Sequence, residues 1–438
     1  MALQGRAESR GASSAEDLPF ELLLMGCRLP DGSVADVGCR HGRIGAIGSP
    51  GTHAADRVVT CGGAVLTPGL VEAHIHLDKA LLSERTPSRE GTLAEAIRVT
   101  GEAKRRFSVE DIRSRARAVL DMAVRQGTTA MRGHVEVDPI VGLMGLEALL
   151  PLKQEYGPAL DLQLCAFAQE GILRAPGTEE LLAEALRKGA DLVGGCPYSD
   201  TDAHAQIDIV FRLAREFGVD ADFHTDFFDE AEHLHVRYIA EQTVRHGWQG
   251  RVAVGHLTEL AALPPEGQDP IIASLREAGI AVIVLPATDL YLMGRRDLKN
   301  VRRGLAPVKR LLAGGVTVAA ATNNVRNAFT PVGTANLALM GYLLTVGAHM
   351  GAAPEIQQAL AMLTEHPARI LRLPDYGLRI GGRADLVLWE TERPEEIITA
   401  LAPPRLVVKG GRVTVEHERT VREPWRPAEG RGIAARRE

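Results

Sequence analysis

Through the middle of this 438-residue chain, apolar runs rich in β-branched residues alternate with segments that have the apolar period of helices. Val109–Arg125 and Ile207–Phe217 are examples of the helical segments. Strands that alternate with helices pair in parallel through right-handed crossovers, and eight such units close a barrel. The sequence therefore predicts the α/β class and, within it, a (β/α)8 TIM barrel. The eight expected strands are Ala64–His76, Thr128–Val137, Asp161–Glu170, Asp191–Tyr198, Val219–Asp226, Arg251–Glu259, Ala281–Leu290 and Thr317–Val325.

The two ends of the chain have a different pattern, in which short apolar runs are separated by Gly, Asp and Pro. Strands are expected at Glu21–Leu29, Val34–Gly38, Gly42–Gly48, Ala384–Trp389 and Arg405–Val415. These runs predict a small β-sandwich domain formed from both termini. The expected organisation is a disordered tail over 1–19, the sandwich over 20–66 and 370–425, the barrel over 67–369, and a disordered tail over 426–438.

Charge and composition argue against several kinds of partner. The formal net charge is −6 and the pI is about 6.2, so we expect no basic surface for nucleic acid or an anionic membrane. The first nineteen residues lack the apolar segment of a secretory signal. The five cysteines form no CxxC pair, which indicates buried thiols in a reducing compartment. The sequence predicts a cytoplasmic protein with no nucleic-acid and no membrane partner.

Histidines stand at the carboxyl ends of several expected strands, where (β/α)8 barrels carry their working residues. The first strand ends in His74-Ile75-His76, the fifth contains His224, and the sixth reaches His256. Alternation along a strand turns His74 and His76 to the same side, so one metal ion can bind both imidazoles. A single strand-end histidine is more often structural, but four of them on three strands favour a metal site. An imidazole-rich set suits Zn²⁺ or Fe²⁺ better than Mg²⁺ or Ca²⁺.

The segment Thr67–Lys79, which reads TPGLVEAHIHLDK, resembles the first-strand motif of the amidohydrolase superfamily. Within that superfamily the chain is similar to cytosine deaminase and to the related s-triazine aminohydrolases, over nearly its whole length. The other segments that carry the resemblance are Arg132–Val137, Ala166–Ile172, Asp191–Gly195, Asp222–Asp226, Val254–His256, Pro331–Asn336 and Gly381–Val387.

The resemblance implies that His74, His76 and His224 hold one divalent metal ion, Zn²⁺ or Fe²⁺. It also implies that His256 binds either the metal or the attacking water. The fourth strand offers Gly194-Gly195-Cys196 and no lysine that could be carbamylated, which implies a mononuclear site. A homo-oligomer is a further expectation from the resemblance.

Two positions depart from the family pattern. Asn323 stands where the family has a strand-eight aspartate that binds metal and accepts a proton, and a neutral amide can ligate weakly but cannot act as a general base. Phe227 stands where cytosine deaminase has a proton-shuttling glutamate, which argues against cytosine as the substrate. Two carboxylates are candidates for the proton transfer: Asp226, which is expected to point into the same barrel mouth as His224, and Asp289 after the seventh strand. Either could instead be a solvated or Arg-paired loop carboxylate, with Arg295 close in sequence.

The substrate is expected to be a small nitrogen heterocycle. The residues expected to contact it are Gln169, which the resemblance assigns to its amide edge, the ring wall of Phe227 and Phe329, and Asn324. Each aromatic side chain could equally be ordinary packing. Lys79 is expected to form an ion pair with Asp78 that anchors the first loop.

These features lead to one main hypothesis and two alternatives. The main one is a metal-dependent amidohydrolase or deaminase that hydrolyses a C–N bond of a nitrogen heterocycle, or of a cyclic amidine or amide, by metal-activated water. A cyclic amide ring-opening hydrolase needs the same activated water but no proton shuttle to a ring nitrogen. A catalytically impaired pseudoenzyme that binds a ligand on the same barrel is the non-enzyme alternative.

Overall fold

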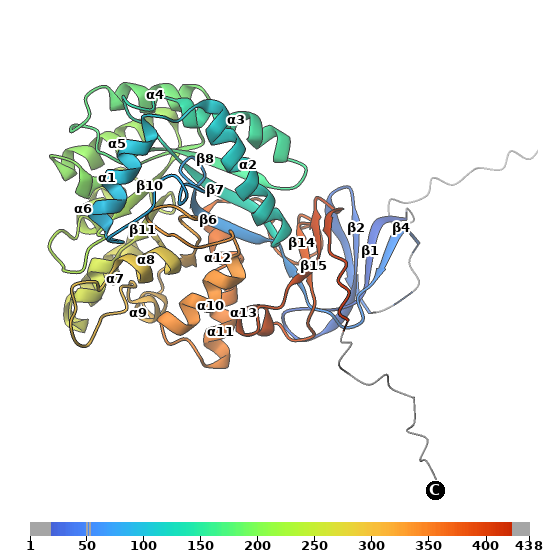
Figure 1. Cartoon of the computed structure of the whole chain (residues 1–438). Helices are drawn as coiled ribbons and strands as arrows, with labels where there is room; N and C mark the ends of the chain where they lie inside the picture. The colour runs from blue at the N-terminus through green and yellow to red at the C-terminus, as the bar shows by residue number, and fades with distance from the viewer. Residues whose placement is uncertain (1–18, 50, 52–53, 423–438) are drawn as a thin grey trace, which may run out of the picture.

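The central sheet is a ring of eight parallel strands in chain order, flanked by helices (Figure 1). A computed structural model of the chain describes residues 19–49, 51 and 54–422. The barrel strands are β6 (Leu70–His76), β7 (Thr128–Glu136), β8 (Asp161–Ala168), β9 (Leu192–Gly195), β10 (Asp220–Thr225), β11 (Val252–His256), β12 (Ala281–Val284) and β13 (Val318–Ala320). The predicted fold class, a (β/α)8 barrel with a small β domain, is confirmed. The two predicted tails, apart from Pro19, lie outside the described residues.

Helices follow the strands and cover the outside of the barrel. They are α1 (Leu93–Lys104), α2 (Val109–Arg125), α3 (Met144–Tyr156), α4 (Thr178–Arg187), α5 (Ala203–Phe217), α6 (Val236–Arg245), α7 (Pro265–Glu277), α8 (Pro286–Leu292), α9 (Val308–Ala313), α10 (Leu337–Gly347), α11 (Ala353–Ala361), α12 (Glu365–Ile370) and α13 (Glu396–Thr399). Capping residues mark where these helices begin and end. The side chain of Ser108 caps the start of α2, and Gly218, with φ 67°, ends α5. No helix in the described ranges combines the length and apolar character needed to cross a membrane.

The barrel closes between its first and last strands just beyond the end of β13. The amide of Asn323 donates to the carbonyl of His74, and the amide of His76 donates to the carbonyl of Asn323, each over 2.8 Å. These two bonds form a parallel bridge between Ile75 and Asn323. The closure of the barrel therefore holds the backbone of Asn323, the residue at the strand-eight position, against His74 and His76 of β6.

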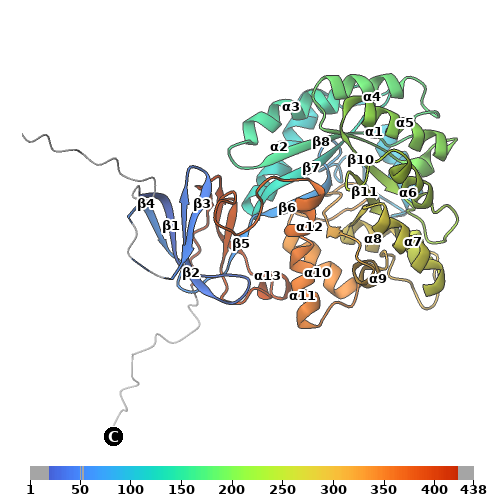
Figure 2. The ribbon, with the colours of Figure 1, turned by 180° about the vertical axis from the view of Figure 1, so that it is seen from behind.

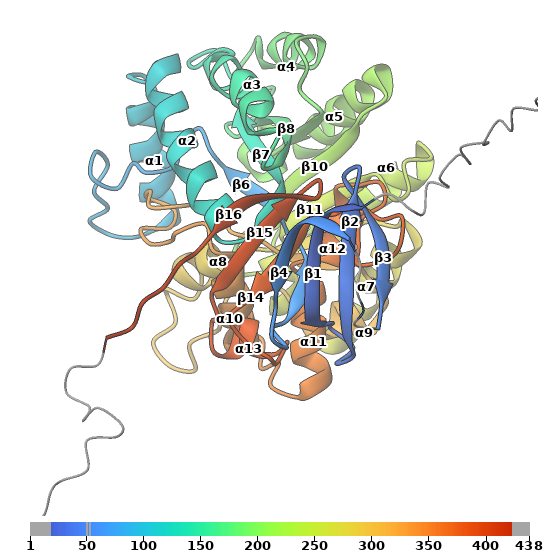
Figure 3. The same cartoon turned by 90° about the vertical axis from the view of Figure 1, so that its right-hand side faces the viewer.

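A β-sandwich built from both ends of the chain lies to one side of the barrel (Figure 2). One sheet has the order β3-β2-β1-β4 and the other β16-β15-β14-β5. The strands are β1 (Phe20–Arg28), β2 (Val34–Arg40), β3 (Arg43–Gly48), β4 (Ala55–Thr60), β5 (Leu66–Pro68), β14 (Leu386–Trp389), β15 (Pro404–Lys409) and β16 (Arg412–Glu416). Figure 3 shows the blue N-terminal sheet beside the red C-terminal strands. Lys409 of β15 bonds to Asp161 at the start of β8, so the sandwich packs at the amino ends of the barrel strands.

Two differences from the expected elements have simple physical reasons. The single strand expected over Ala64–His76 is two strands, because Gly69 interrupts the apolar run and β5 pairs with β14 in the sandwich. The strand β4 was not expected, because most of its side chains are exposed and it lies at a sheet edge without an apolar alternation. The expectation of buried cysteine thiols is confirmed for all five.

Candidate active site

Three imidazoles meet at the carboxyl end of the barrel. The Nε2 atom of His224, on β10, lies 2.9 Å from Nε2 of His74 and 3.0 Å from Nε2 of His76, both on β6. Two nitrogen ligands of a tetrahedral zinc ion lie about 3.3 Å apart, because each Zn–N bond is about 2.0–2.1 Å long. The spacing of the three ring nitrogens is thus close to that of a metal ligand set.

The environment of these rings fits a divalent cation. All three are buried, and burial is the main reason that the pKa values of His74, His76 and His224 lie well below the usual value; the neighbouring histidines of the site lower them further. The rings are therefore neutral at physiological pH, which is the form that binds metal. The side-chain oxygen of Asn323 is also buried beside the cavity and has no hydrogen-bond partner. A cation bound between the rings would accept lone pairs from the ring nitrogens and from the Asn323 oxygen.

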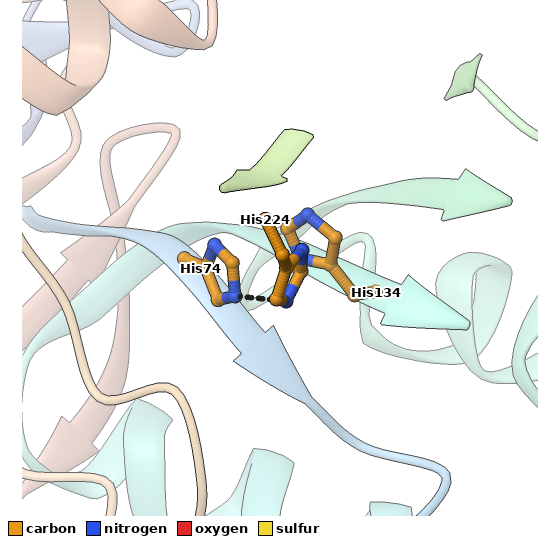
Figure 4. A group of neighbouring side chains, drawn as sticks. All are labelled: His74, His134 and His224. Carbon is orange, nitrogen blue, oxygen red and sulfur yellow. Dashed lines mark hydrogen bonds between the residues drawn. The ribbon is translucent and has the colours of Figure 1, made fainter. Parts of the chain in front are cut away.

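A fourth imidazole, that of His134 on β7, lies against this group. Figure 4 shows the rings of His74, His134 and His224 gathered at one point. His134 stacks on His74 with 4.0 Å between ring centroids, and its Nε2 lies 3.3 Å from Asp222 Oδ1. One nitrogen from each of these three histidines lies within 4.8 Å of the others. His134 therefore either supports the ring of His74 or offers an additional nitrogen.

A cavity opens beside the histidines. Its lining residues are His76, Lys79, Leu93, Ile97, Gln169, Tyr198, His224, Phe227, His256, Thr288, Asn323, Asn324 and Phe329. Leu93 and Ile97 belong to α1, so this helix forms part of the cavity wall. The aromatic side chains in this lining, Tyr198, Phe227 and Phe329, offer flat apolar faces against which a ring can pack.

His256 and Asp289 form a hydrogen-bonded pair at one wall of the cavity. Nδ1 of His256 lies 2.7 Å from Oδ1 of Asp289, which is buried and also accepts the amide of Leu285. Burial raises the pKa of Asp289, while His256 and the amide bond act in the opposite direction. The ring of Phe227 stacks on His256 with 3.8 Å between centroids. The imidazole is thus held in one orientation, with Nδ1 towards the carboxylate.

Lys79 brings a positive charge to the opposite wall. Its ammonium group donates to Oε1 of Gln169 over 2.8 Å and lies 3.5 Å from Oε2 of Glu136. The rings of Phe167 and Phe329 lie 5.7 and 5.5 Å from the same nitrogen. The expected ion pair with Asp78 does not form, because the Asp78 carboxylate instead accepts the amide of Glu136.

The sequence matches the family described as "Amidohydrolase family" over residues 57–415, which is more than half of the chain. The chain belongs to the amidohydrolase family. This membership confirms the predicted class of enzyme, a hydrolase that acts on C–N bonds other than peptide bonds. Members of the family depend on a metal ion.

The chain is similar to known hydrolases and deaminases over most of their length. The structure of 5-methylcytosine deaminase from Klebsiella pneumoniae has a TM-score of 0.87 and 30% identity, covering 92% of this chain and 100% of that one. N-isopropylammelide isopropyl amidohydrolase from Pseudomonas sp. (strain ADP) is 28% identical over 91% of this chain and 98% of its own. Pterin deaminase from Rhizobium rhizogenes is 28% identical over 79% of each chain.

The structure of this amidohydrolase brings most of the expected site residues to one cavity. The expected residues that line it are His76, His224, His256, Gln169, Phe227, Asn323, Asn324 and Phe329. His74 lies directly behind His76 and His224, and Asp289 lies behind His256.

Asp226 does not point into the barrel mouth, contrary to the expectation from its spacing to His224. Its carboxylate accepts the amides of His235 and Val236 at the start of α6, over 2.8 and 3.0 Å. The reason is that β10 ends at Thr225 and Asp226 has φ 53°, so strand alternation no longer sets the direction of its side chain. Asp226 thus stabilises the amino end of a helix.

Sequence reasoning gave no site role to Lys79, His134, Leu93 or Ile97. Lys79 lies three residues after His76, and this closeness to an expected metal ligand could have identified it as a site residue. Leu93 and Ile97 carried no such signal, because their place at the cavity depends on how α1 folds back over the barrel.

Proposed function

We propose that this amidohydrolase removes an amino or alkylamino group from a nitrogen heterocycle by hydrolysis of a C–N bond. The observation that carries the proposal is the convergence of three imidazole nitrogens at the wall of a cavity lined by aromatic side chains. The relatives named for N-isopropylammelide and pterin support a ring substrate.

His74, His76 and His224 would hold one divalent metal ion, with Asn323 as a weak oxygen ligand. When bound, such an ion acts as a Lewis acid that makes water a nucleophile near neutral pH. The neutral state of the three buried rings supports this assignment. The choice between Zn²⁺ and Fe²⁺ rests on the imidazole-rich donor set, which accepts both.

His256 would move the proton that Asn323 cannot accept. With the Nδ1 proton donated to Asp289, the lone pair of Nε2 is free at the cavity wall. This nitrogen takes a proton from the attacking water and returns it to the departing nitrogen of the substrate. Asp289 would orient the ring and stabilise its protonated form.

The substrate ring would lie between the aromatic side chains of the cavity. Phe227 and Phe329 offer apolar faces, and Gln169 and Asn324 offer polar groups at its edges. Their shared position on one cavity supports these roles.

The test is release of ammonia or amine by the purified, metal-supplied chain from a panel of amino- and alkylamino-substituted pyrimidines, triazines and pteridines. We expect turnover that is lost on chelation and restored by Zn²⁺ or Fe²⁺. His256→Gln should lower kcat by about 10²–10⁴-fold with metal content unchanged. Asp289→Asn should lower it by roughly 10–100-fold, the usual effect of losing an orienting partner.

His204→Gln is the matched control, because His204 is an exposed histidine outside the cavity and should leave turnover unchanged. Product without ammonia or amine would instead indicate the ring-opening alternative. Metal-loaded protein that binds ring compounds and hydrolyses none would indicate the pseudoenzyme.

Three further expectations belong to this proposal. The protein would be cytoplasmic, would form a homo-oligomer, and would have neither nucleic acid nor membrane as a partner. The acidic net charge supports the absence of polyanionic partners. Subcellular fractionation and light scattering of the purified chain test the first two.

A further inference from the structure

The three proposed metal ligands lack the hydrogen bonds that usually orient metal-binding histidines. In most metal sites the second ring nitrogen of each histidine donates to a carboxylate, a carbonyl or water, and this bond sets the direction of the ring. The Nδ1 atoms of His74, His76 and His224 are buried and have no hydrogen-bond partner among the described residues. Within the protein, contacts of another kind therefore hold these rings.

Face-to-face ring stacking supplies such a contact for two of the three ligands. The ring of His134 lies on the ring of His74, with 4.0 Å between the centroids and 28° between the planes. The ring of Phe167 lies on the ring of His224, with 4.2 Å between the centroids and 28° between the planes. A phenylalanine ring has no nitrogen that could bind a metal, so the feature that the two supporting residues share is a flat face.

The orientation of His134 distinguishes a supporting ring from a fourth ligand. The lone pair of an imidazole nitrogen lies in the ring plane, so the lone pairs of two stacked rings run nearly parallel and do not meet within the length of two zinc–nitrogen bonds. The ring of His74 is tilted by 57° to that of His224 and by 75° to that of His76, but by only 28° to that of its neighbour His134. The Nε2 atom of His134 lies 3.3 Å from Oδ1 of Asp222. His134 is therefore placed to support His74 and not to share its ion.

A buried ion pair holds His134 from the next layer of the barrel. Arg132 lies two residues before His134 on β7, and Asp222 lies at the corresponding place before the histidine of β10. Alternation along the strands turns both side chains into the barrel interior, nearer to the amino ends of the strands. Nη1 of Arg132 donates to Oδ2 of Asp222 over 2.9 Å, and Nη2 donates to the carbonyl of Ile370 at the end of α12. These bonds fix the carboxylate whose other oxygen faces His134.

From these contacts we propose that ring stacking, rather than hydrogen bonding, orients two of the metal ligands. His134 is the positioning residue for His74. Phe167 is the positioning residue for His224. Each flat ring keeps the imidazole that it covers from rotating, and so keeps the Nε2 atom of that imidazole directed at the ion. The inference rests on the proposed function for the identity of the ligands.

The affinity of the full-length chain for Zn²⁺ tests the proposal with a pair of variants at one position. His134→Phe and His134→Leu both remove the ring nitrogens and the contact with Asp222, but only His134→Phe keeps a flat face. Competition with a chromophoric chelator measures the Kd for Zn²⁺. This Kd should rise about 10–100-fold in His134→Leu, the usual cost of losing an orienting partner, and should stay close to the wild-type value in His134→Phe.

Phe167 provides a second arm in which no nitrogen is removed. Phe167→Leu should raise the Kd for Zn²⁺ by a similar factor, because the ring of His224 loses its support. Phe211→Leu is the matched control: Phe211 is equally buried, but it lies on α5 and packs on Phe223. It should lower the free energy of unfolding in urea without changing the Kd.

The visible absorption of bound Co²⁺ gives a readout that a loss of stability alone would not move, because it depends on the number and geometry of the ligands. The spectrum of His134→Phe should match that of the wild type, since no ligand has been removed. A changed spectrum together with a raised Kd in His134→Phe would show that His134 binds the metal, and would overturn the proposal.

The proposal is equally overturned if folded His134→Leu and Phe167→Leu bind Zn²⁺ as tightly as the wild type. If His134→Leu does not fold, Phe167→Leu decides alone. A wild-type chain that binds no Zn²⁺ refutes the ligand set and this inference with it. A chain that binds the ion with the expected effects of the variants, but hydrolyses no ring compound, refutes only the proposed activity.

Discussion

At the scale of single residues, the site depends on buried polar atoms that the rest of the protein does not satisfy: the Nε2 atoms of the three histidines face only one another, and the Asn323 side-chain oxygen has no partner. The Nδ1 atoms of the same three rings are buried without a partner as well, and burying unsatisfied polar atoms is unfavourable unless a ligand compensates for it. A metal ion is the simplest ligand that serves imidazoles in this arrangement.

Removal of one imidazole should release the metal. His224→Ala leaves His74 and His76 as the remaining strong donors, and we expect metal content after dialysis to fall from about one ion per chain to a small fraction. Elemental analysis by mass spectrometry measures this. His204→Ala should retain the metal, and full retention in His224→Ala would contradict the assigned ligand set.

Asn323→Asp should strengthen metal binding. The change places a negative charge where a neutral oxygen lies now, and the backbone at φ 62° accepts Asp as it does Asn. Competition with a chelator should show at least about tenfold higher affinity, equivalent to one charge-assisted contact. Asn324→Asp is the control: its side chain accepts from Asn327 instead, so a smaller gain is expected there. An equal gain at both positions would argue against Asn323 as a ligand.

At the scale of elements, α1 is held over the cavity by one buried lysine at its last position. The ammonium group of Lys104 bonds to Glu136 over 2.8 Å, to Asp138 over 2.5 Å, and to Glu170. Further along the helix, Ala96 packs with Phe227 and Phe329 in one apolar cluster. The helix therefore contributes both to the cavity wall and to its closure.

Lys104→Met should destabilise the fold strongly. It leaves three carboxylates without their shared cation, and breaking a buried ion pair costs about 3–5 kcal/mol. Urea unfolding should show this loss in the free energy of unfolding. Lys153→Met removes a half-exposed pair with Asp191 and should cost less than about 1 kcal/mol. Similar losses in both variants would contradict the role given to Lys104.

The strand pattern predicted the barrel and the imidazole group well, because both follow from strand order and alternation. His74 and His76 share one side of β6 as expected, and β10 brings His224 to them. Prediction failed where the chain leaves its strands. Asp226 turns away through a positive φ, and the partner of Lys79 is Glu136 on the neighbouring strand, a contact between residues distant in sequence.

At the scale of the whole molecule, the sandwich and the cavity lie at opposite ends of the barrel strands. The ammonium of Lys409 on β15 is buried between Asp161 of β8 and Asp385 beside β14. This junction ties the two ends of the chain to the amino side of the barrel, so it acts on stability rather than on the site.

Lys409→Met should therefore lower stability without changing the metal site. Asp385 is 7% exposed and would keep Arg383 at 3.3 Å as its cation, so the loss of Lys409 should lower the free energy of unfolding by about 1–3 kcal/mol, measured in urea. Metal content of the folded variant should match that of the wild type. A folded variant that had lost its metal would show that the junction supports the site directly.

The central claim is that one divalent ion is held by His74, His76 and His224. A crystal structure of the full chain supplied with Zn²⁺ or Fe²⁺, recorded at the absorption edge of that metal, tests it most directly. We expect a single anomalous peak about 2.0–2.1 Å from Nε2 of each of these three histidines. No peak at that position, or a peak held by other residues, would contradict the account.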